Sequence, residues 1–312
     1  MLEKFERYPL TFGPTPIEKL GRLSKHLGGK VQIYAKREDC NSGLAFGGNK
    51  TRKLEFLVAE ARDQGAKTLV SGGALQSNHC RQTAAAAARF GFKCILVLTG
   101  ERPKQPSANL LLDELFGAEI IHVADREDRD RILQETFNQA AEKGMRPYLV
   151  PYGGSSPTGA LGYAFAMKEL MEQDLQADWI VFATSSGGTH AGLLLGQRVF
   201  GYKGKVLGIS VDESENWLKE HVSDLASLTS EKLGERIEFT PGEVLADASH
   251  CSAGRSAKHC ASSATITSRL ATRAELVAKR SSLCHSEWPH ISASRANCRS
   301  LPMATMIRWS AV

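Results

Sequence analysis

The amino-acid sequence predicts an α/β fold in which mostly parallel strands are flanked by helices. Between about residues 31 and 211, short apolar runs alternate with segments of helical period, which is the pattern of successive β-α-β units. The chain has 312 residues, enough for one large domain or two medium ones. Its composition, 42% hydrophobic and 23% charged, is ordinary for a globular protein.

The predicted elements follow from these periodicities. Residues 52–63 place Leu54, Leu57, Val58 and Ala61 on one helical face, and residues 82–89 and 109–116 have the same character. No internal repeat occurs. The predicted strands are 31–36, 67–70, 94–98, 119–123, 148–150, 179–183 and 206–211.

The net charge of +5 is unevenly distributed. Residues 251–312 hold nine of the 39 Lys and Arg residues but two of the 34 acids, which leaves 30 bases against 32 acids in residues 1–250. A mildly acidic body gives no reason to expect a nucleic-acid partner. The alternative, a nucleic-acid-binding protein, is supported only by the nine Lys and Arg residues of the tail.

No run approaches the roughly 18 apolar residues of a membrane span, and residues 1–7 lack an apolar signal core. We therefore expect a soluble, cytoplasmic protein with no membrane partner.

The seven cysteines are expected to be reduced thiols. Their number is odd, and none forms a C-x-x-C pair. Three adjacent His-Cys pairs after residue 249, at 250–251, 259–260 and 284–285, lack the spacing of metal ligands, so no metal site is predicted.

Residues 251–312 form an atypical basic tail. They contain twelve Ser and eleven Ala, no Gly after Gly254, and no strand pattern longer than three or four residues. Such a segment buries too little apolar area to offset its chain entropy, so we expect it to be poorly ordered.

A first candidate site is the turn Gly47–Lys53, which leads into a predicted helix. It is not a P-loop, because Asn49 stands where that motif needs Gly before the lysine. A desolvated lysine at a helix start has a lowered pKa and can form a Schiff base. The alternative is that Lys50 is a surface lysine at a turn.

A second candidate is Ser71–His79, between a strand and an alanine-rich helix. Ser77 or Asn78 can cap that helix. Polar side chains and free N–H groups at a helix start also suit a carboxylate.

A third candidate is Thr184–Gly192, again between a strand and a helix. Small residues, hydroxyls and N–H groups there favour a phosphate site over a simple capped turn. We expect a bulky residue at Gly187 to fill the space in which N–H groups approach the phosphate.

Together the three turns describe a site for pyridoxal 5′-phosphate (PLP). The lysine would bind the aldehyde, the third turn the phosphate, and the Ser-Asn turn the substrate carboxylate and the ring hydroxyl.

The sequence resembles the ACC deaminase and D-cysteine desulfhydrase family. Residues 8–17 and 34–55 closely resemble 1-aminocyclopropane-1-carboxylate (ACC) deaminase, whereas residues 76–85, 153–163 and 186–192 look more like D-cysteine desulfhydrase. The resemblance runs from about residue 5 to 248. It implies the tryptophan-synthase-β-like PLP fold, with two open sheets, and a homodimer or larger homo-oligomer.

The resemblance also implies roles and domains. Lys50 would be the Schiff-base lysine and proton shuttle, Asn78 would bond the ring hydroxyl, and Ser77 and Gln76 would face the substrate carboxylate. Residues 1–52 with 158–250 would form a large PLP-binding domain, and 53–157 a small one. Lys53 would hold the phosphate with Ser185, Ser186, Gly187, Gly188 and Thr189.

The chain departs from the family pattern after about residue 248. Family members continue with a Leu-Asp-Pro-Val-Tyr-type motif and a Thr-Gly-Gly segment, and neither occurs in residues 249–312. ACC chemistry uses residues of the absent motif, so the sequence favours a D-cysteine desulfhydrase that forms pyruvate, sulfide and ammonia. The alternatives are an ACC deaminase that forms 2-oxobutanoate and ammonia, or a PLP-fold protein inactivated by its altered C-terminus.

Overall fold

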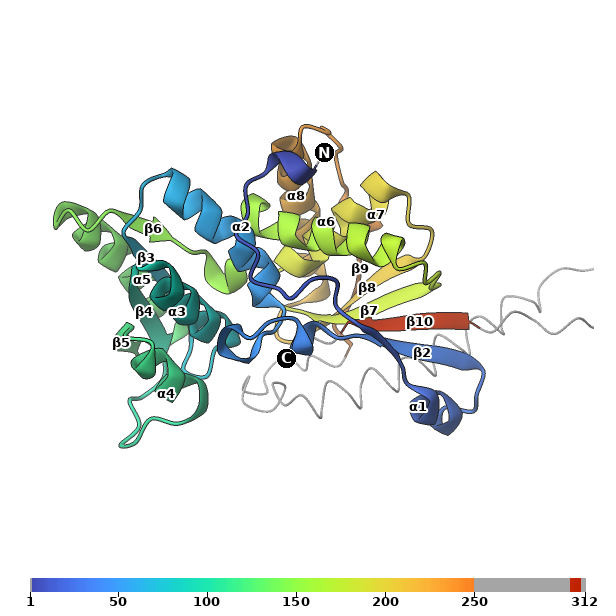
Figure 1. Cartoon of the computed structure of the whole chain (residues 1–312), viewed down its shortest axis with the longest axis horizontal. Coiled ribbons are helices and arrows are strands. Elements are labelled where there is room, and N and C mark those ends of the chain that lie inside the picture. The colour runs from blue at the N-terminus through green and yellow to red at the C-terminus, as the bar shows by residue number, and fades with distance from the viewer. Residues whose placement is uncertain (1, 250–303, 310–312) are drawn as a thin grey trace, which may run out of the picture.

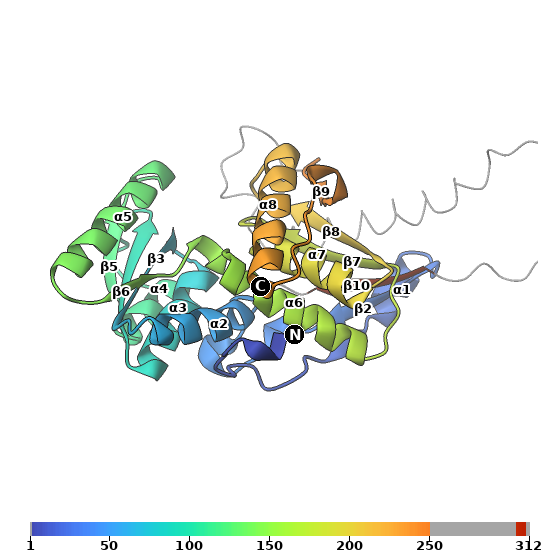
Figure 2. The same cartoon turned by 90° about the horizontal axis from the view of Figure 1, so that it is seen from above.

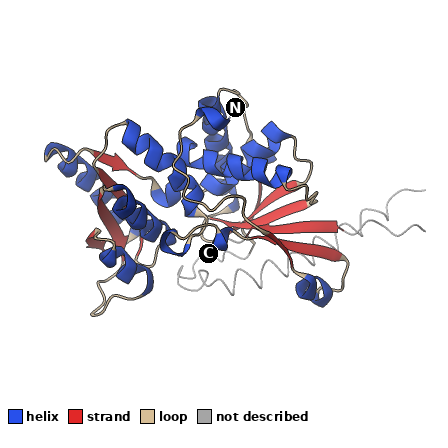
Figure 3. Ribbon diagram, viewed as in Figure 1, coloured by secondary structure: helices blue, strands red, loops and turns tan. Residues whose placement is uncertain are grey.

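The computed structural model describes residues 2–249 and 304–309 and contains two separate sheets, each flanked by helices (Figure 1). Figure 3 shows the two groups of strands apart from each other, with helices around both. The α/β prediction is confirmed, and each of the seven predicted strands is present with ends shifted by a few residues at most.

The smaller sheet has four parallel strands in the order β5-β4-β3-β6. Its central strands are apolar on both faces, as a sheet covered by helices on both sides requires. In β4, Leu96, Val97 and Leu98 have no exposed surface. The strands are β3 (Thr68–Ala74), β4 (Lys93–Thr99), β5 (Glu119–Val123) and β6 (Pro147–Leu149).

The larger sheet has six strands in the order β1-β2-β10-β7-β8-β9. Only the edge pair β1–β2 is antiparallel among the described strands. The three-residue strands β1 and β9 were not predicted, because they are too short to show a period. The strands are β1 (Ile17–Lys19), β2 (Val31–Lys36), β7 (Trp179–Thr184), β8 (Lys205–Ser210), β9 (Leu245–Asp247) and β10 (Ala304–Trp309).

Strand β10 lies within residues 251–312, where the sequence pattern predicts no strand of this length. It lies between β2 and β7 and pairs in parallel with both. Pairing on two sides supplies hydrogen bonds that local residue preferences do not reveal. The remainder of the predicted basic tail lies outside the described residues.

Helices cover both sheets. Helices α6, α7 and α8 lie together over one face of the larger sheet, and α3, α4 and α5 surround the smaller one (Figures 1 and 2). No helix in the described part of the chain has the length and apolar character needed to cross a membrane. The helices are α1 (Gly21–His26), α2 (Lys50–Asp63), α3 (Asn78–Phe90), α4 (Ala108–Leu115), α5 (Arg126–Glu142), α6 (Pro157–Glu172), α7 (Gly188–Phe200) and α8 (Glu215–Leu233), with 3₁₀ turns at Leu2–Lys4, Glu38–Cys40, Leu44–Phe46, Tyr152–Gly154 and Pro241–Glu243.

The four-stranded sheet with its helices forms a smaller lobe, and the six-stranded sheet with its helices forms a larger lobe. Helix α2 packs against both lobes. Leu54 and Leu57 belong to the core under the smaller sheet, and Phe56 belongs to the core formed with α6, α7 and α8. The proposed domain boundary between residues 52 and 53 falls inside the first turn of this helix. The division into domains stays a prediction, although every described strand of the smaller sheet comes from residues 53–157.

A buried ion cluster fixes the start of α2. Arg52 Nε lies 2.6 Å from Glu38 Oε2, and its Nη1 lies 2.9 Å from Glu169 Oε2. Lys36 also pairs with Glu169, and the Thr15 hydroxyl donates to Glu38. All five side chains are buried. The cluster therefore ties α2 to the end of β2 and to α6.

We expect Arg52→Ala to lower the free energy of unfolding by about 3–5 kcal/mol, because it leaves buried carboxylates without their partner. Denaturant titration measures this change. Arg131→Ala is the matched control, since Arg131 forms exposed pairs with Asp128 and Glu135 and should change stability by less than about 1 kcal/mol. Equal effects of the two substitutions would contradict a structural role for the cluster.

Candidate functional site

Lys50 is the first residue of α2 and is half-buried. Its Nζ donates to Asn49 Oδ1 at 3.1 Å, and burial lowers the pKa of the amine to about 8. The loop before it is strained, because Ala45 and Phe46 have φ values of 45° and 64°. A lysine with this pKa has a sizeable neutral fraction near pH 7 and is a competent nucleophile and base.

Lys53 lies one turn further along α2 and is buried. Its Nζ donates to the Gly153 carbonyl at 3.0 Å and to Ser155 Oγ at 3.5 Å. Burial and then the charge of Lys50 hold its pKa well below the usual range. Among the described side chains no carboxylate pairs with Lys50 or Lys53. Two neighbouring amines without a counter-ion favour an anionic ligand.

The turn at Gly153 borders the space beside Lys50. Its φ is 62°, a left-handed value that favours glycine. A Cβ at Gly153 would lie 2.3 Å from Ser186 Oγ and 3.8 Å from Lys50 Cε. The missing side chain therefore leaves room between the lysine and the loop after β7.

The turn at Ser155 meets the start of α7 directly. Ser155 Oγ donates to Ser186 Oγ at 2.8 Å and accepts from the Gly188 N–H at 3.0 Å. A Cβ at Gly188 would lie 2.6 Å from Ser155 Oγ and 3.0 Å from Lys53 Nζ. Hydroxyls and a lysine thus line a narrow space that only a glycine at position 188 leaves open.

The first turn of α7 supplies backbone donors. The N–H groups of Thr189 and His190 have no acceptor within the helix, by the geometry of a helix start. The Gly188 N–H is already donated to Ser155 and to the Ser186 carbonyl. Free N–H groups near Lys53 form a suitable anion site.

Two residues of the third turn face elsewhere. A Cβ at Gly187 would lie 2.7 Å from the His221 ring and 3.3 Å from Val222, so the expectation that a side chain there fills the anion space is wrong. Ser185 lies beside Asp212: burial raises the pKa of this carboxyl, and the Ser185 hydroxyl acts to lower it.

The second predicted turn forms the start of α3. Ser77 is the cap, as predicted, and its Oγ accepts from the Cys80 N–H at 3.2 Å. The N–H groups of Asn78 and His79 are free of intrahelical acceptors. Gln76 is exposed and bonds to residues 107 and 109. The turn can therefore offer both side-chain and backbone donors to a carboxylate.

His79 connects this turn to the lysines. It is buried, its Nε2 lies 3.1 Å from Ser71 Oγ, and its pKa is lowered to about 3 by burial and by the positive charges of Lys50 and Lys53. The Gly47 carbonyl, just before Lys50, accepts from the α3 side chain of Gln82 at 2.8 Å. The fold therefore brings all three predicted turns to one place.

Several residues of this site were missed by the sequence analysis. Gly153 and Ser155 stand in a Gly-Gly-Ser-Ser turn between a strand and a helix, the same signal as the other turns, yet no role was assigned to them. His79 ends the second candidate turn but carries no predicted role, and no pattern indicates Arg81 or Asn109, because their roles depend on contacts between separate elements.

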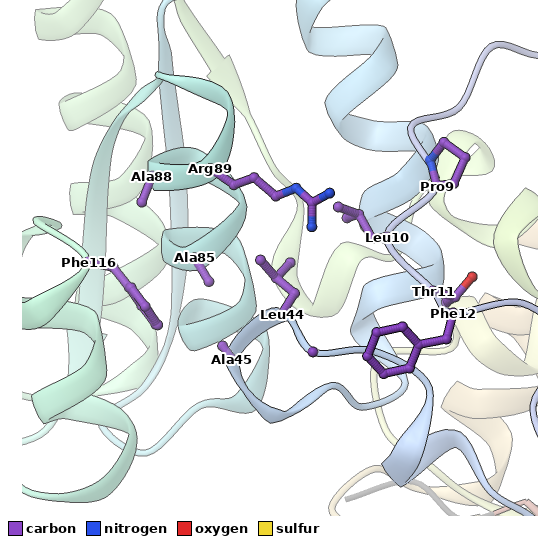
Figure 4. Close-up of a pocket in the computed structure, with 11 residues that line it drawn as sticks. Pro9, Leu10, Thr11, Phe12, Leu44, Ala45, Ala85, Ala88, Arg89 and Phe116 are labelled. Carbon is purple, nitrogen blue, oxygen red and sulfur yellow. The ribbon is translucent and has the colours of Figure 1, made fainter.

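A separate cavity of about 490 Å³ lies between the N-terminal segment, the loop before Gly47 and α3 (Figure 4). It contains none of the predicted site residues, and Arg89 is the only charged residue among the described residues that line it. We therefore assign no chemistry to it. Its lining consists of Pro9, Leu10, Thr11, Phe12, Gly43, Leu44, Ala45, Ala85, Ala88, Arg89 and Phe116.

Comparisons with known proteins agree with this geometry. Residues 8–258 match the family model described as "Pyridoxal-phosphate dependent enzyme". The chain is 46% identical over 257 residues to the 1-aminocyclopropane-1-carboxylate deaminase of Methylobacterium nodulans, covering 78% of this chain and 76% of that protein. It is 45% identical over 264 residues to the enzyme of the same name from Mesorhizobium japonicum, covering 80% and 78%.

Solved structures give the same picture. The crystal structure of an ACC deaminase homologue superposes with a TM-score of 0.79 at 29% identity, covering 99% of this chain and 93% of that one. Threonine deaminase isoform 2 of Solanum lycopersicum superposes with a TM-score of 0.61 at 15% identity, covering 96% and 78%, and shares the fold.

The residues present fit PLP. The desolvated Lys50 suits its aldehyde, and Lys53 with the start of α7 suits its phosphate. The glycines at 153 and 188 leave the space that the group needs.

We expect Lys53→Met to weaken PLP binding at least tenfold while leaving the apoprotein as stable or more stable. The substitution removes a buried amine without a counter-ion but also a charged donor to the phosphate. Fluorescence titration gives the affinity, and thermal unfolding gives the stability. Lys143→Met, at an exposed position, should change neither. Parallel losses of binding and stability would instead assign Lys53 a structural role.

The lowered pKa of Lys50 predicts a pH dependence of cofactor capture. Only the neutral amine attacks the aldehyde, so the rate should rise as pH approaches about 8 and then level off. An ordinary lysine would continue to gain rate toward pH 10. Stopped-flow absorbance of apoprotein mixed with PLP measures this, with Lys50→Ala as the control. A rate still rising steeply above pH 9 would show that the amine is not desolvated.

Proposed function

Since this chain belongs to the family of pyridoxal-phosphate-dependent enzymes, we propose that it is a deaminase that converts ACC to 2-oxobutanoate and ammonia. The observation that carries the proposal is the position of the Lys50 amine, whose pKa is about 8. It lies beside the anion site at the start of α7 and beside the start of α3, whose N–H groups can bind a carboxylate. Relatives named ACC deaminase, more than 40% identical to this chain, support the choice of substrate.

The proposed roles follow from the contacts of each residue. When bound, PLP supplies an electron sink for charge that develops on the substrate carbon next to the amine. Lys50 attaches the cofactor and moves protons at the reacting carbons. Ser77, Gln76 and the N–H groups at the start of α3 hold the substrate carboxylate, and Asn78 holds the ring hydroxyl. Lys53, the Ser186 hydroxyl and the backbone of the turn from Gly187 to Thr189 hold the phosphate, whereas the Ser185 side chain lies beside Asp212.

D-cysteine is the alternative substrate, because the segments at 76–85 and 186–192 look more like D-cysteine desulfhydrase. The residues proposed to bind ACC and PLP would also bind D-cysteine and PLP. Lys50 would take the proton from Cα, sulfide would leave from Cβ, and hydrolysis of the remaining enamine would give pyruvate and ammonia. The two substrates therefore differ in product and in the need for a proton at Cα.

Turnover of ACC and of D-cysteine by the purified protein with PLP tests the proposal. We expect 2-oxobutanoate from ACC, and pyruvate with sulfide from D-cysteine only if the alternative holds. Lys50→Ala should abolish both activities, and borohydride should attach the cofactor to the peptide containing Lys50 in the unsubstituted protein alone. A Lys50→Ala protein with full turnover would refute the proposal.

We also infer that the protein assembles as a homodimer. Phe12 and Phe46 are 79% and 74% exposed, which is unusual for large apolar side chains and is relieved by burial in an interface. Sedimentation of the purified protein checks this, and a monomer at micromolar concentration would contradict it.

A further inference from the structure

The turn before α4 is bonded to the turn before α3. The Asn109 amide Nδ2 donates to Asn78 Oδ1 and to the Gln76 carbonyl, both at 2.8 Å. The Asn109 N–H donates to Gln76 Oε1 at 2.9 Å, and Gln76 Nε2 donates to the Ser107 carbonyl at 3.2 Å. Arg81 Nη1 donates to Asn109 Oδ1 at 2.9 Å and to Asn78 Oδ1 at 3.2 Å.

The chemistry of these groups fixes the orientation of both amides. Arg81 has donors and no acceptor, so the atoms that face it in Asn78 and Asn109 are oxygens. The Gln76 carbonyl accepts only, so the atom of Asn109 that faces it is the nitrogen. Asn78 Oδ1 therefore receives two donors, and its Nδ2 has no acceptor among the described residues.

The turn is held in this position at an energetic cost. Ala108 has a φ of 49°, a left-handed value that disfavours a residue with a Cβ. Arg81 also reaches the loop before Lys50, where its Nη2 donates to the Gly47 carbonyl at 3.1 Å. The bonds of Asn109 and Arg81 thus couple the start of α4 to the start of α3 and to the lysine loop.

We infer that Asn109 is a positioning residue that, with Arg81, holds the Asn78 amide so that its NH₂ group is the atom offered to the ligand. This inference rests on the proposed function, in which Asn78 bonds the ring hydroxyl of PLP. An NH₂ donor stabilises that hydroxyl as its anion, whereas an amide oxygen in the same place would repel the anion. Among the described residues, the Asn109 side chain bonds to Gln76, Asn78 and Arg81, so its proposed effect on the ligand passes through Asn78.

Asn109→Asp tests the orientation with a side chain of the same size. The carboxylate keeps its bond from Arg81 but replaces the donor to Asn78 Oδ1 with an anionic oxygen that repels it. This repulsion at 2.8 Å should outweigh the longer 3.2 Å bond from Arg81 to Asn78, so the Asn78 amide should turn over and donate to Asp instead. We expect PLP affinity to fall about tenfold by fluorescence titration, with the thermal midpoint of the apoprotein little changed. Asn138→Asp, the same change on the exposed face of α5, should have no effect.

Asn109→Ala separates orientation from packing. Arg81 alone still requires an oxygen from Asn78, so the amide should keep its direction and PLP affinity should fall less than threefold. A larger loss of PLP affinity in Asn109→Asp than in Asn109→Ala, each compared with the unsubstituted protein, supports the inference. Equal losses in the two variants, or an unchanged affinity in Asn109→Asp, would overturn it.

A readout without cofactor distinguishes this inference from the proposed function. In the apoprotein labelled with ¹⁵N-asparagine, the Asn78 NH₂ signals should shift downfield and exchange more slowly in Asn109→Asp, and not in Asn109→Ala. An unchanged Asn78 signal in Asn109→Asp would refute the positioning role even if PLP binds. If the Asn78 signals change as expected in Asn109→Asp but no cofactor becomes attached to Lys50 in the unsubstituted protein, the proposed function alone is refuted.

Discussion

Arg52 stands two residues after Lys50 and ties the first turn of α2 to both Glu38 and Glu169 below the protein surface. Its planar guanidinium offers donors in a fixed geometry, so the two carboxylates define the position and rotation of the helix start. Because α2 packs against the cores of both lobes, its placement also sets the separation of the two sheets. The location of the reactive lysine is thus a consequence of a contact that takes no part in the chemistry.

In the first turn of α2, the buried basic side chains have two different kinds of surroundings. Arg52 is compensated by two carboxylates, whereas among the described residues the amines of Lys50 and Lys53 donate only to an amide oxygen, a carbonyl and a hydroxyl. Compensation makes the first group a structural anchor. Its absence makes the other two reactive and receptive to an anion, since burial without a partner favours the neutral amine until a negative ligand arrives. A few residues of one helix thereby combine rigidity with binding capacity.

The sequence predicts the parts of this protein whose signals are local. The seven predicted strands are buried apolar runs between helical segments, and the turns at Lys50, Ser77 and Ser186 are small, polar and adjacent to helix starts. Strand β1 and strand β9 have three residues each and carry no period. The contact of Gly153 with Ser186, and the bonds from Asn109 to Asn78, join residues about 30 positions apart along the chain. No pattern in the sequence encodes such pairs, so the identity of the turns is predictable but their mutual arrangement is not.

The position of β10 determines when the larger sheet can be completed. Residue 304 pairs with residue 31, so nearly the whole chain must leave the ribosome before β2 and β7 gain their shared neighbour. The smaller sheet draws its strands from residues 68–149 and can form much earlier in synthesis. During that interval β2 and β7 each present an unpaired strand edge, the kind of surface that captures other chains. The nascent protein is thus most vulnerable to aggregation in its larger lobe, and a chain that ends before residue 304 keeps that vulnerability permanently.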